Sequence, residues 1–330
     1  MEENNTRDER TSPPIIDPNQ NRAAETDGNY PRYSPLPFVI LALIGIFFFY
    51  QGIGGGLTLL LFGNSIRQDN VNEMRWATLL GEIFFLLVPT LMLMKWQHGK
   101  LSAAVPWRIP KTSEVVLTVL GIFSLQEFLE GYLYFQDKIP LPDRLRPYID
   151  QIRKMIEETY RQLLQAHTTP ELLFLIIVIA LTPAICEELL FRGLVQKNLS
   201  LGLTKKSAFI LTGIIFGLYH VNPFLLVPLV VIGMYLSFLL YRSETILVPM
   251  IAHFINNGIS VVGEFVRQNS SSSNSLAFLS DLPDTSSTMV ISMMIGSGVF
   301  FALSLLVYVS VTSRLKADLI AHQAVPEADR

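Results

Sequence analysis

The chain has 330 residues, of which 50% are hydrophobic and 16% are charged. A soluble domain usually carries about 25% charged residues, so this composition argues against a soluble enzyme and for a membrane protein. The formal net charge of −3 gives no reason to expect a nucleic-acid partner. The single cysteine, Cys186, excludes an internal disulfide bond.

The chain opens with a polar, proline-containing segment at residues 1–35. This segment has no apolar stretch of the kind that a signal peptide needs. We therefore expect a disordered N-terminal tail and no cleavable signal peptide.

Eight apolar runs follow the tail. They cover residues 36–62, 76–94, 115–125, 172–185, 208–219, 224–240, 246–262 and 289–311. Most of them approach the roughly 20 residues that a helix needs to cross the hydrocarbon layer of a membrane. The runs at 115–125 and 208–219 are shorter, and they cross only if their polar ends are also helical. The pattern predicts an all-α polytopic membrane protein, a bundle of about eight transmembrane helices, with the first three in residues 36–135.

An amphipathic segment at 136–169 separates the third run from the fourth. Its apolar residues recur at helical spacing, with acids and bases on the opposite face. These apolar residues are Leu145, Ile149, Ile152, Ile156, Tyr160 and Leu163. The pattern predicts a helix in the membrane interface, which serves either as a connector or as a lid that handles the substrate.

The rest of the chain divides into a core with polar motifs at 170–266, a polar loop at 267–287, and a last transmembrane helix with a short tail at 288–330. Lys and Arg gather in the short loops that share a side with the N-terminus, and such loops are usually cytoplasmic. We therefore expect both termini of this multi-pass protein in the cytoplasm, and the inner or plasma membrane as its location if the cell is bacterial. The basic segment 136–169 is an exception to this charge bias.

The first polar cluster within the apolar runs is PAICEELLFRGLVQ. Thr169 and Pro170 are suited to the start of its helix. Glu188 and Arg192 are four residues apart, so they share a helical face and can pair. Glu187 points about 100° away from Glu188, which leaves one neutralised carboxylate and one that is free to act as a base. The alternative is a Glu–Arg pair that only holds two helices together.

Two further clusters, FGLYH and AHFINN, follow in the next helices. Phe216 and His220 share one helical face, as do His253 and Asn257. Each cluster alone also fits a packing role, because His and Asn commonly hydrogen-bond between membrane helices. At 1.5 Å per residue, Glu187, His220 and His253 lie about 18, 22 and 14 Å from the cytoplasmic helix ends, at comparable depth. Gly213, Gly217, Gly233 and Ser237 are small enough to let these helices approach closely.

The sequences EELLFR, FGLYH and HFINN, in this order, resemble the three signature motifs of the CPBP family. This family of intramembrane glutamic endopeptidases includes the type II CAAX prenyl proteases and bacterial Abi proteins. The resemblance implies an all-α membrane bundle with a cavity open to the cytosol, and a CPBP-like catalytic core at 170–266. It further implies that Glu187 activates water with the help of His220, and that His253 and Asn257 hold the oxyanion. Glu188, Arg192 and Phe216 would support the site.

The implied partners are the lipid bilayer and a membrane-embedded or lipidated peptide, such as a prenylated CAAX tail. We expect no metal and no other cofactor, although Glu187, His220 and His253 are legitimate zinc ligands and keep a zinc protease open as an alternative. A nucleophilic Cys186 and a non-catalytic membrane scaffold are further alternatives. A transporter is another, since the third run also carries Gln126, Glu127 and Glu130.

Overall fold

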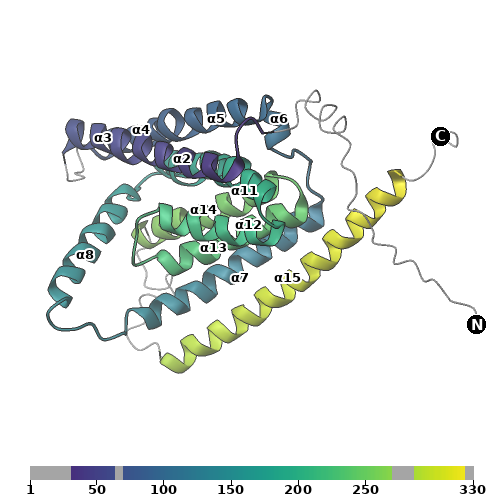
Figure 1. Ribbon diagram of the computed structural model, residues 1–330. Helices are drawn as coiled ribbons and strands as arrows, with labels where there is room; N and C mark the ends of the chain where they lie inside the picture. The colour runs from purple at the N-terminus through teal and green to yellow at the C-terminus, as the bar shows by residue number, and fades with distance from the viewer. Residues whose placement is uncertain (1–30, 64–69, 270–285, 324–330) are drawn as a thin grey trace, which may run out of the picture.

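The computed structural model describes residues 31–63, 70–269 and 286–323, with side chains up to residue 313. All regular structure in these ranges is helical, which confirms the all-α prediction (Figure 1). The predicted disordered tail and polar loop fall largely on residues outside these ranges.

Each of the eight apolar runs lies on a helix, but the predicted count of eight membrane spans is not confirmed. Within the described ranges, six helices are long and apolar enough to cross a membrane. They are Pro35–Phe62, Val71–His98, Thr112–Gln136, Thr169–Gly202, Leu226–Ser243 and Ser287–Ser313. Helix α12 (Lys205–Tyr219) has only 15 residues, a length of about 22 Å that falls short of the hydrocarbon thickness. Helix α14 (Leu247–Asn269) has 23 residues but carries His and Asn at its centre.

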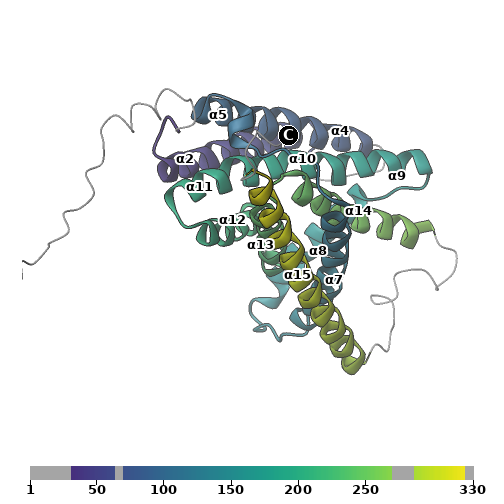
Figure 2. The same ribbon diagram turned by 90° about the vertical axis from the view of Figure 1, so that its right-hand side faces the viewer.

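The first two spans cover the fourth on one side of the molecule (Figures 1 and 2). The first span joins α2 (Pro35–Phe47) to α3 (Gly55–Phe62), and the second joins α4 (Val71–Gly81) to α5 (Val88–His98). The fourth joins α9 (Thr169–Leu175), α10 (Thr182–Glu188) and α11 (Lys197–Gly202). The core between these layers is apolar, with Ile46, Leu86, Met94, Leu190 and Phe216 among its buried residues. A short helix, α6 (Leu101–Ala104), follows α5.

A second core lies where α7 (Thr112–Gln136) meets α13 (Leu226–Ser243), α14 and α15 (Ser287–Gln323). Its buried members include Ile122, Leu125, Tyr235, Leu236 and Tyr308. Figure 2 shows α15 crossing the outside of the bundle along α7.

Helices α12 and α13 touch through their backbones, as the small residues predict. A Cβ atom on Gly213 would lie 2.4 Å from the backbone nitrogen of Met234, and one on Gly233 would lie 2.8 Å from the carbonyl oxygen of Gly213. Any larger side chain at these two positions would therefore force the helices apart. This close approach brings the end of α12, where His220 lies, against the face of α13 that includes Gly233.

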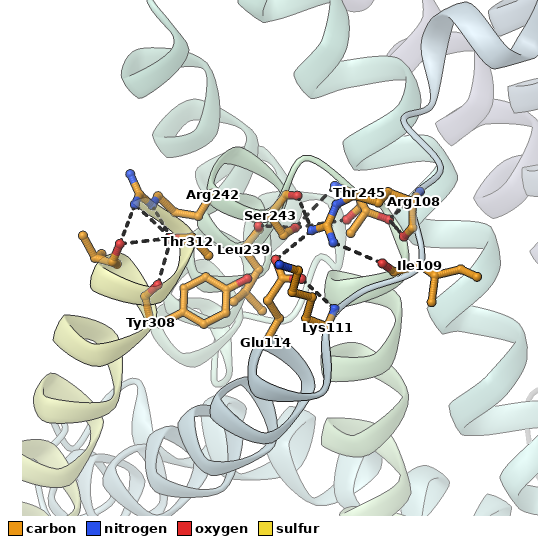
Figure 3. A network of polar contacts seen from close by, with 11 residues as sticks. Arg108, Ile109, Lys111, Glu114, Leu239, Arg242, Ser243, Thr245, Tyr308 and Thr312 are labelled. Carbon is orange, nitrogen blue, oxygen red and sulfur yellow. Dashed lines mark hydrogen bonds and ion pairs between the residues drawn. The ribbon is translucent and has the colours of Figure 1, made fainter. Parts of the chain in front are cut away.

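Polar contacts join neighbouring helix ends to one another in two separate regions of the bundle. In the first region, Gln97 of α5 contacts Tyr33 before α2 and Asn198 of α11. Figure 3 shows Arg108 before α7 bonded to Glu114 at 2.7 Å and to the carbonyl oxygen of Ser243 at 2.8 Å. In the same network, Arg242 of α13 reaches Thr312 and other residues of α15.

The second region includes the amphipathic helix α8 (Arg146–Leu163), which lies at one side of the molecule (Figure 1). Buried Arg75 of α4 donates to the carbonyl oxygens of Leu163 and Gln165. Gln268 of α14 accepts a hydrogen bond from the backbone N–H of Ala166 at 3.0 Å. The C-terminal end of α8 is thus fixed to the second span and to α14.

Candidate active site

The helix that carries the first motif begins one residue earlier than predicted. Thr168, rather than Thr169, is the N-cap, because its hydroxyl accepts from the backbone N–H of Glu171. The Glu171 carboxylate in turn accepts from the backbone N–H of Thr168, which completes a capping box. Pro170 lies in the first turn, as predicted.

This helix widens on both sides of α10 (Thr182–Glu188). Residues Ile176–Leu181 and Leu189–Gln196 are π-helical and flank α10. Pro183 has no N–H, so the carbonyl oxygen of Ile179, four residues earlier, lacks its α-helical donor. The side-chain amide of Asn257 donates to this oxygen at 3.1 Å. π-Helical turns of this kind are frequent at functional sites.

Glu188 and Arg192 form the predicted pair. Glu188 Oε1 lies 2.9 Å from Arg192 Nη1, and both side chains are 0% exposed. Arg192 Nη2 also donates to the carbonyl oxygen of Gly233 at 2.9 Å, which links the fourth span to α13. The guanidinium carbon lies 5.0 Å from the centre of the Phe216 ring, within the range of a cation–π contact.

His253 brings α14 to the same carboxylate. Its Nδ1 lies 2.8 Å from Glu188 Oε1. A carboxylate that pairs with an arginine accepts hydrogen bonds, so Nδ1 carries the proton and Nε2 is turned toward Glu187. The side chain of His253 is buried.

Glu187 lies between two imidazole rings from different helices. Its Oε2 is 3.7 Å from His220 Nε2 and 3.9 Å from His253 Nε2. These separations exceed a direct hydrogen bond and fall in the range in which a water molecule can bridge polar groups. Among the described residues, Glu187 Oε2 is buried and has no hydrogen-bond partner.

The other nitrogen of His220 fixes the orientation of this ring. Nδ1 lies 2.7 Å from the carbonyl oxygen of Phe216, which can only accept, so the ring donates there and presents Nε2 to Glu187. The Phe216 ring packs against both imidazoles, with its centre 4.5 Å from that of His220 and 5.8 Å from that of His253.

Asn257 lies beside this cluster, one helical turn or about 6 Å along α14 from His253. Its side-chain nitrogen donates to Ile179 and its oxygen accepts from Asn256 at 3.1 Å. One of the two N–H bonds of its amide is therefore used by the Ile179 carbonyl group, whose α-helical donor Pro183 removes. The second N–H bond remains available for a ligand.

Two neighbours of Glu187 lie outside the predicted set. Glu82 is only 5% exposed. It lies on the π-helical turns Glu82–Leu87, which pack against α10. Its carboxylate is close enough to Glu187 for the two charges to interact. Tyr160 approaches from α8; enclosure of its hydroxyl group and the charges of Glu187 and Glu82 raise its pKa, although 53% of the residue surface is exposed. The sequence does offer one sign that Glu82 has a functional role, because it is an ionisable residue within an apolar run.

The remaining sequence candidates have surroundings that differ from those of Glu187 Oε2. Cys186 is buried in the apolar core below the first two spans. Glu127 and Glu130 are exposed on α7, whereas Gln126 donates to the backbone carbonyl of Asn256 at 3.0 Å. Within the described ranges, no group of three or more His, Cys, Asp and Glu residues is arranged to hold a metal ion.

Residues 169–259 match the family model described as type II CAAX prenyl endopeptidase Rce1-like. This stretch of the chain is therefore similar to the Rce1-like family. The match covers less than a third of the sequence, and no curated protein and no solved structure matches the chain. Together with the six apolar helices of the described ranges, this match supports an integral membrane protein of the CAAX endopeptidase type. The matched region includes Glu187, His220, His253 and Asn257, whereas Glu82, Gln126 and Tyr160 lie outside it.

Proposed function

We propose that this protein hydrolyses peptide bonds within the membrane, using a water molecule that Glu187 activates. The observation that carries the proposal is the position of Glu187 Oε2, which is buried, has no hydrogen bond among the described residues and lies 3.7 and 3.9 Å from two imidazole nitrogens. A water molecule held at this point would touch a base and two further proton-exchanging groups.

In the reaction, Glu187 removes a proton from the water while His220 Nε2 holds the same water in place. The water oxygen forms a bond to the carbonyl carbon, and the π electrons of the carbonyl group move to its oxygen. When the C–N bond breaks, the proton held by Glu187 passes to the leaving nitrogen. The products are a carboxylate and an amine, and no other reactant is consumed.

The oxyanion formed in this step needs donors at the developing charge. His253 can donate from Nε2 when that nitrogen carries a proton, while the Glu188 carboxylate on Nδ1 holds the ring in position. Asn257 can donate the N–H bond that Ile179 does not use. Arg192 holds the Glu188 carboxylate in position, so it acts on the reaction through His253.

The proposed substrates are membrane-associated peptides, among them tails with a prenylated cysteine followed by three residues. The family match and the apolar helices around the site support this class. Prenylation would bring such a tail to the bilayer, where the site lies.

The test uses purified protein and a fluorogenic peptide that ends in a prenylated CAAX sequence, with the same peptide lacking the lipid as its control. We expect cleavage of the lipidated peptide by the intact protein and none by a Glu187→Gln variant of equal folded content. A comparison of membrane peptides in cells with each form would then identify natural substrates. Equal cleavage by both forms would exclude the proposed base.

A further inference from the structure

Three side-chain amides connect α7 to the edge of the site. Gln126 on α7 donates to the backbone carbonyl of Asn256 at 3.0 Å. Asn256 donates from its side chain to Asn257 Oδ1 at 3.1 Å, and Asn257 donates to the carbonyl oxygen of Ile179 at 3.1 Å. The chain of contacts runs from the third span, across α14, to the span that carries Glu187.

The acceptor at the end of this chain determines how each asparagine amide is turned. The carbonyl oxygen of Ile179 can only accept, so the nitrogen of Asn257 must face it. The oxygen of Asn257 therefore faces Asn256, which must offer its own nitrogen in return. By the same reasoning, Gln126 must face the Asn256 carbonyl with its nitrogen. Only one arrangement of the three amides satisfies both backbone carbonyls.

This arrangement leaves two acceptors without partners. Gln126 Oε1 and Asn256 Oδ1 are buried and have no hydrogen bond within the described part of the chain. Buried acceptors without donors destabilise a fold, and natural proteins keep few of them. An apolar residue at either position would avoid this cost, which indicates that the amides are kept for another purpose.

We propose, on the basis of the function proposed above, that Gln126 and Asn256 are positioning residues which aim the second N–H bond of Asn257 at the substrate carbonyl. Asn256 holds the oxygen end of the Asn257 amide, so the amide cannot turn over. Gln126 holds the backbone at Asn256, and through it the register of α14 against α7. Neither residue touches the reacting atoms, so each acts only through Asn257.

The experiment is a double-mutant cycle on the fluorogenic peptide with a prenylated CAAX tail. The four proteins are the intact chain, Asn256→Leu, Asn257→Ala and the double variant. Leucine has nearly the shape of asparagine but cannot donate to Asn257. We expect Asn256→Leu to lower kcat roughly 10- to 100-fold, as a displaced catalytic group does, with KM unchanged. In the Asn257→Ala background the same change should have no further effect on kcat.

A second variant, Gln126→Met, repeats the cycle from the other helix and replaces Asn256→Leu if that protein does not fold. Ser260→Ala is the matched control, because exposed Ser260 reaches the same Asn256 carbonyl at 3.5 Å but does not contact the other amides. We expect this control to keep normal kcat.

Two failures can be told apart. If Asn257→Ala alone keeps normal kcat, Asn257 is not an oxyanion donor and that part of the proposed function is wrong. If Asn257→Ala lowers kcat but Asn256→Leu and Gln126→Met have no effect, or lower it by the same factor in both backgrounds, then the positioning role is wrong.

Discussion

His253 Nδ1 lies 2.8 Å from Glu188 Oε1, a contact that joins α14 to the fourth span across 65 positions of the sequence. Arg192 Nη1 occupies the same carboxylate oxygen at 2.9 Å. Glu188 Oε1 therefore has two donors, while Oε2 of the adjacent Glu187 has no hydrogen bond among the described residues and lies 3.7 and 3.9 Å from two imidazole nitrogens. The two glutamates thus have different expected roles. We expect replacement of Glu188 to lower stability and replacement of Glu187 to abolish hydrolysis.

Glu188→Gln should destabilise the fold. This change leaves the guanidinium of Arg192 without a counter-charge in a fully buried position. Loss of one partner of a buried ion pair commonly costs about 3–5 kcal/mol of folding free energy. The folded fraction in detergent, measured by thermal unfolding, should fall. A double replacement, Glu188→Gln with Arg192→Met, should recover part of the loss; a double variant less stable than Glu188→Gln would contradict the pair's structural role.

His220→Ala should lower kcat strongly while leaving the fold intact. The His220 ring lies at the end of α12, is not fully buried and contacts Glu187 only across a gap of 3.7 Å. The substitution removes a proton-exchanging group, and such groups commonly raise the rate of catalysis roughly 10²–10⁴-fold. Steady-state turnover and the unfolding midpoint measured on one sample separate the two effects. If turnover per folded molecule is unchanged, His220 takes no part in activating water.

Cysteine labelling should place the C-terminal end and the start of α12, which contains Lys206, on the cytoplasmic side. Cys186 is buried in an apolar core, so Cys186→Ala is a suitable background. Single cysteines at Lys206 and Lys316 should then react from the cytoplasm, and one at Ser272 from the opposite side. Reaction of the Lys206 and Ser272 variants from the same side would contradict the proposed topology.

Hydrolysis should survive metal chelators. The motif residues include no thiolate and no pair of histidines at the spacing H-E-x-x-H, which is typical of zinc proteases. Activity on the prenylated peptide is measured before and after dialysis against a strong chelator. Inactivation that only added zinc reverses would favour the zinc protease instead.

The sequence predicted the helices and the meeting of Glu187, His220 and His253 because apolar runs, helical spacing and depth are local properties. The predicted span at 208–219 is not confirmed, because α12 adds only three residues before the run and ends at Tyr219. Two other features depend on contacts between distant segments. Asn257 donates to the carbonyl oxygen of Ile179, 78 positions away, where Pro183 provides no N–H. The approach of Glu82 and Tyr160 to the site depends on how the second span and α8 pack.

Turnover per folded molecule of Glu187→Gln, set against that of Glu188→Gln, tests the central claim most directly. Glutamine keeps the shape of Glu187 but cannot take a proton from water. We expect Glu187→Gln to be folded, to bind the prenylated peptide and to cleave none of it. The folded fraction of Glu188→Gln should keep measurable turnover. Near-normal turnover by Glu187→Gln, with none by folded Glu188→Gln, would reverse the two roles, and near-normal turnover by both would refute the glutamate mechanism.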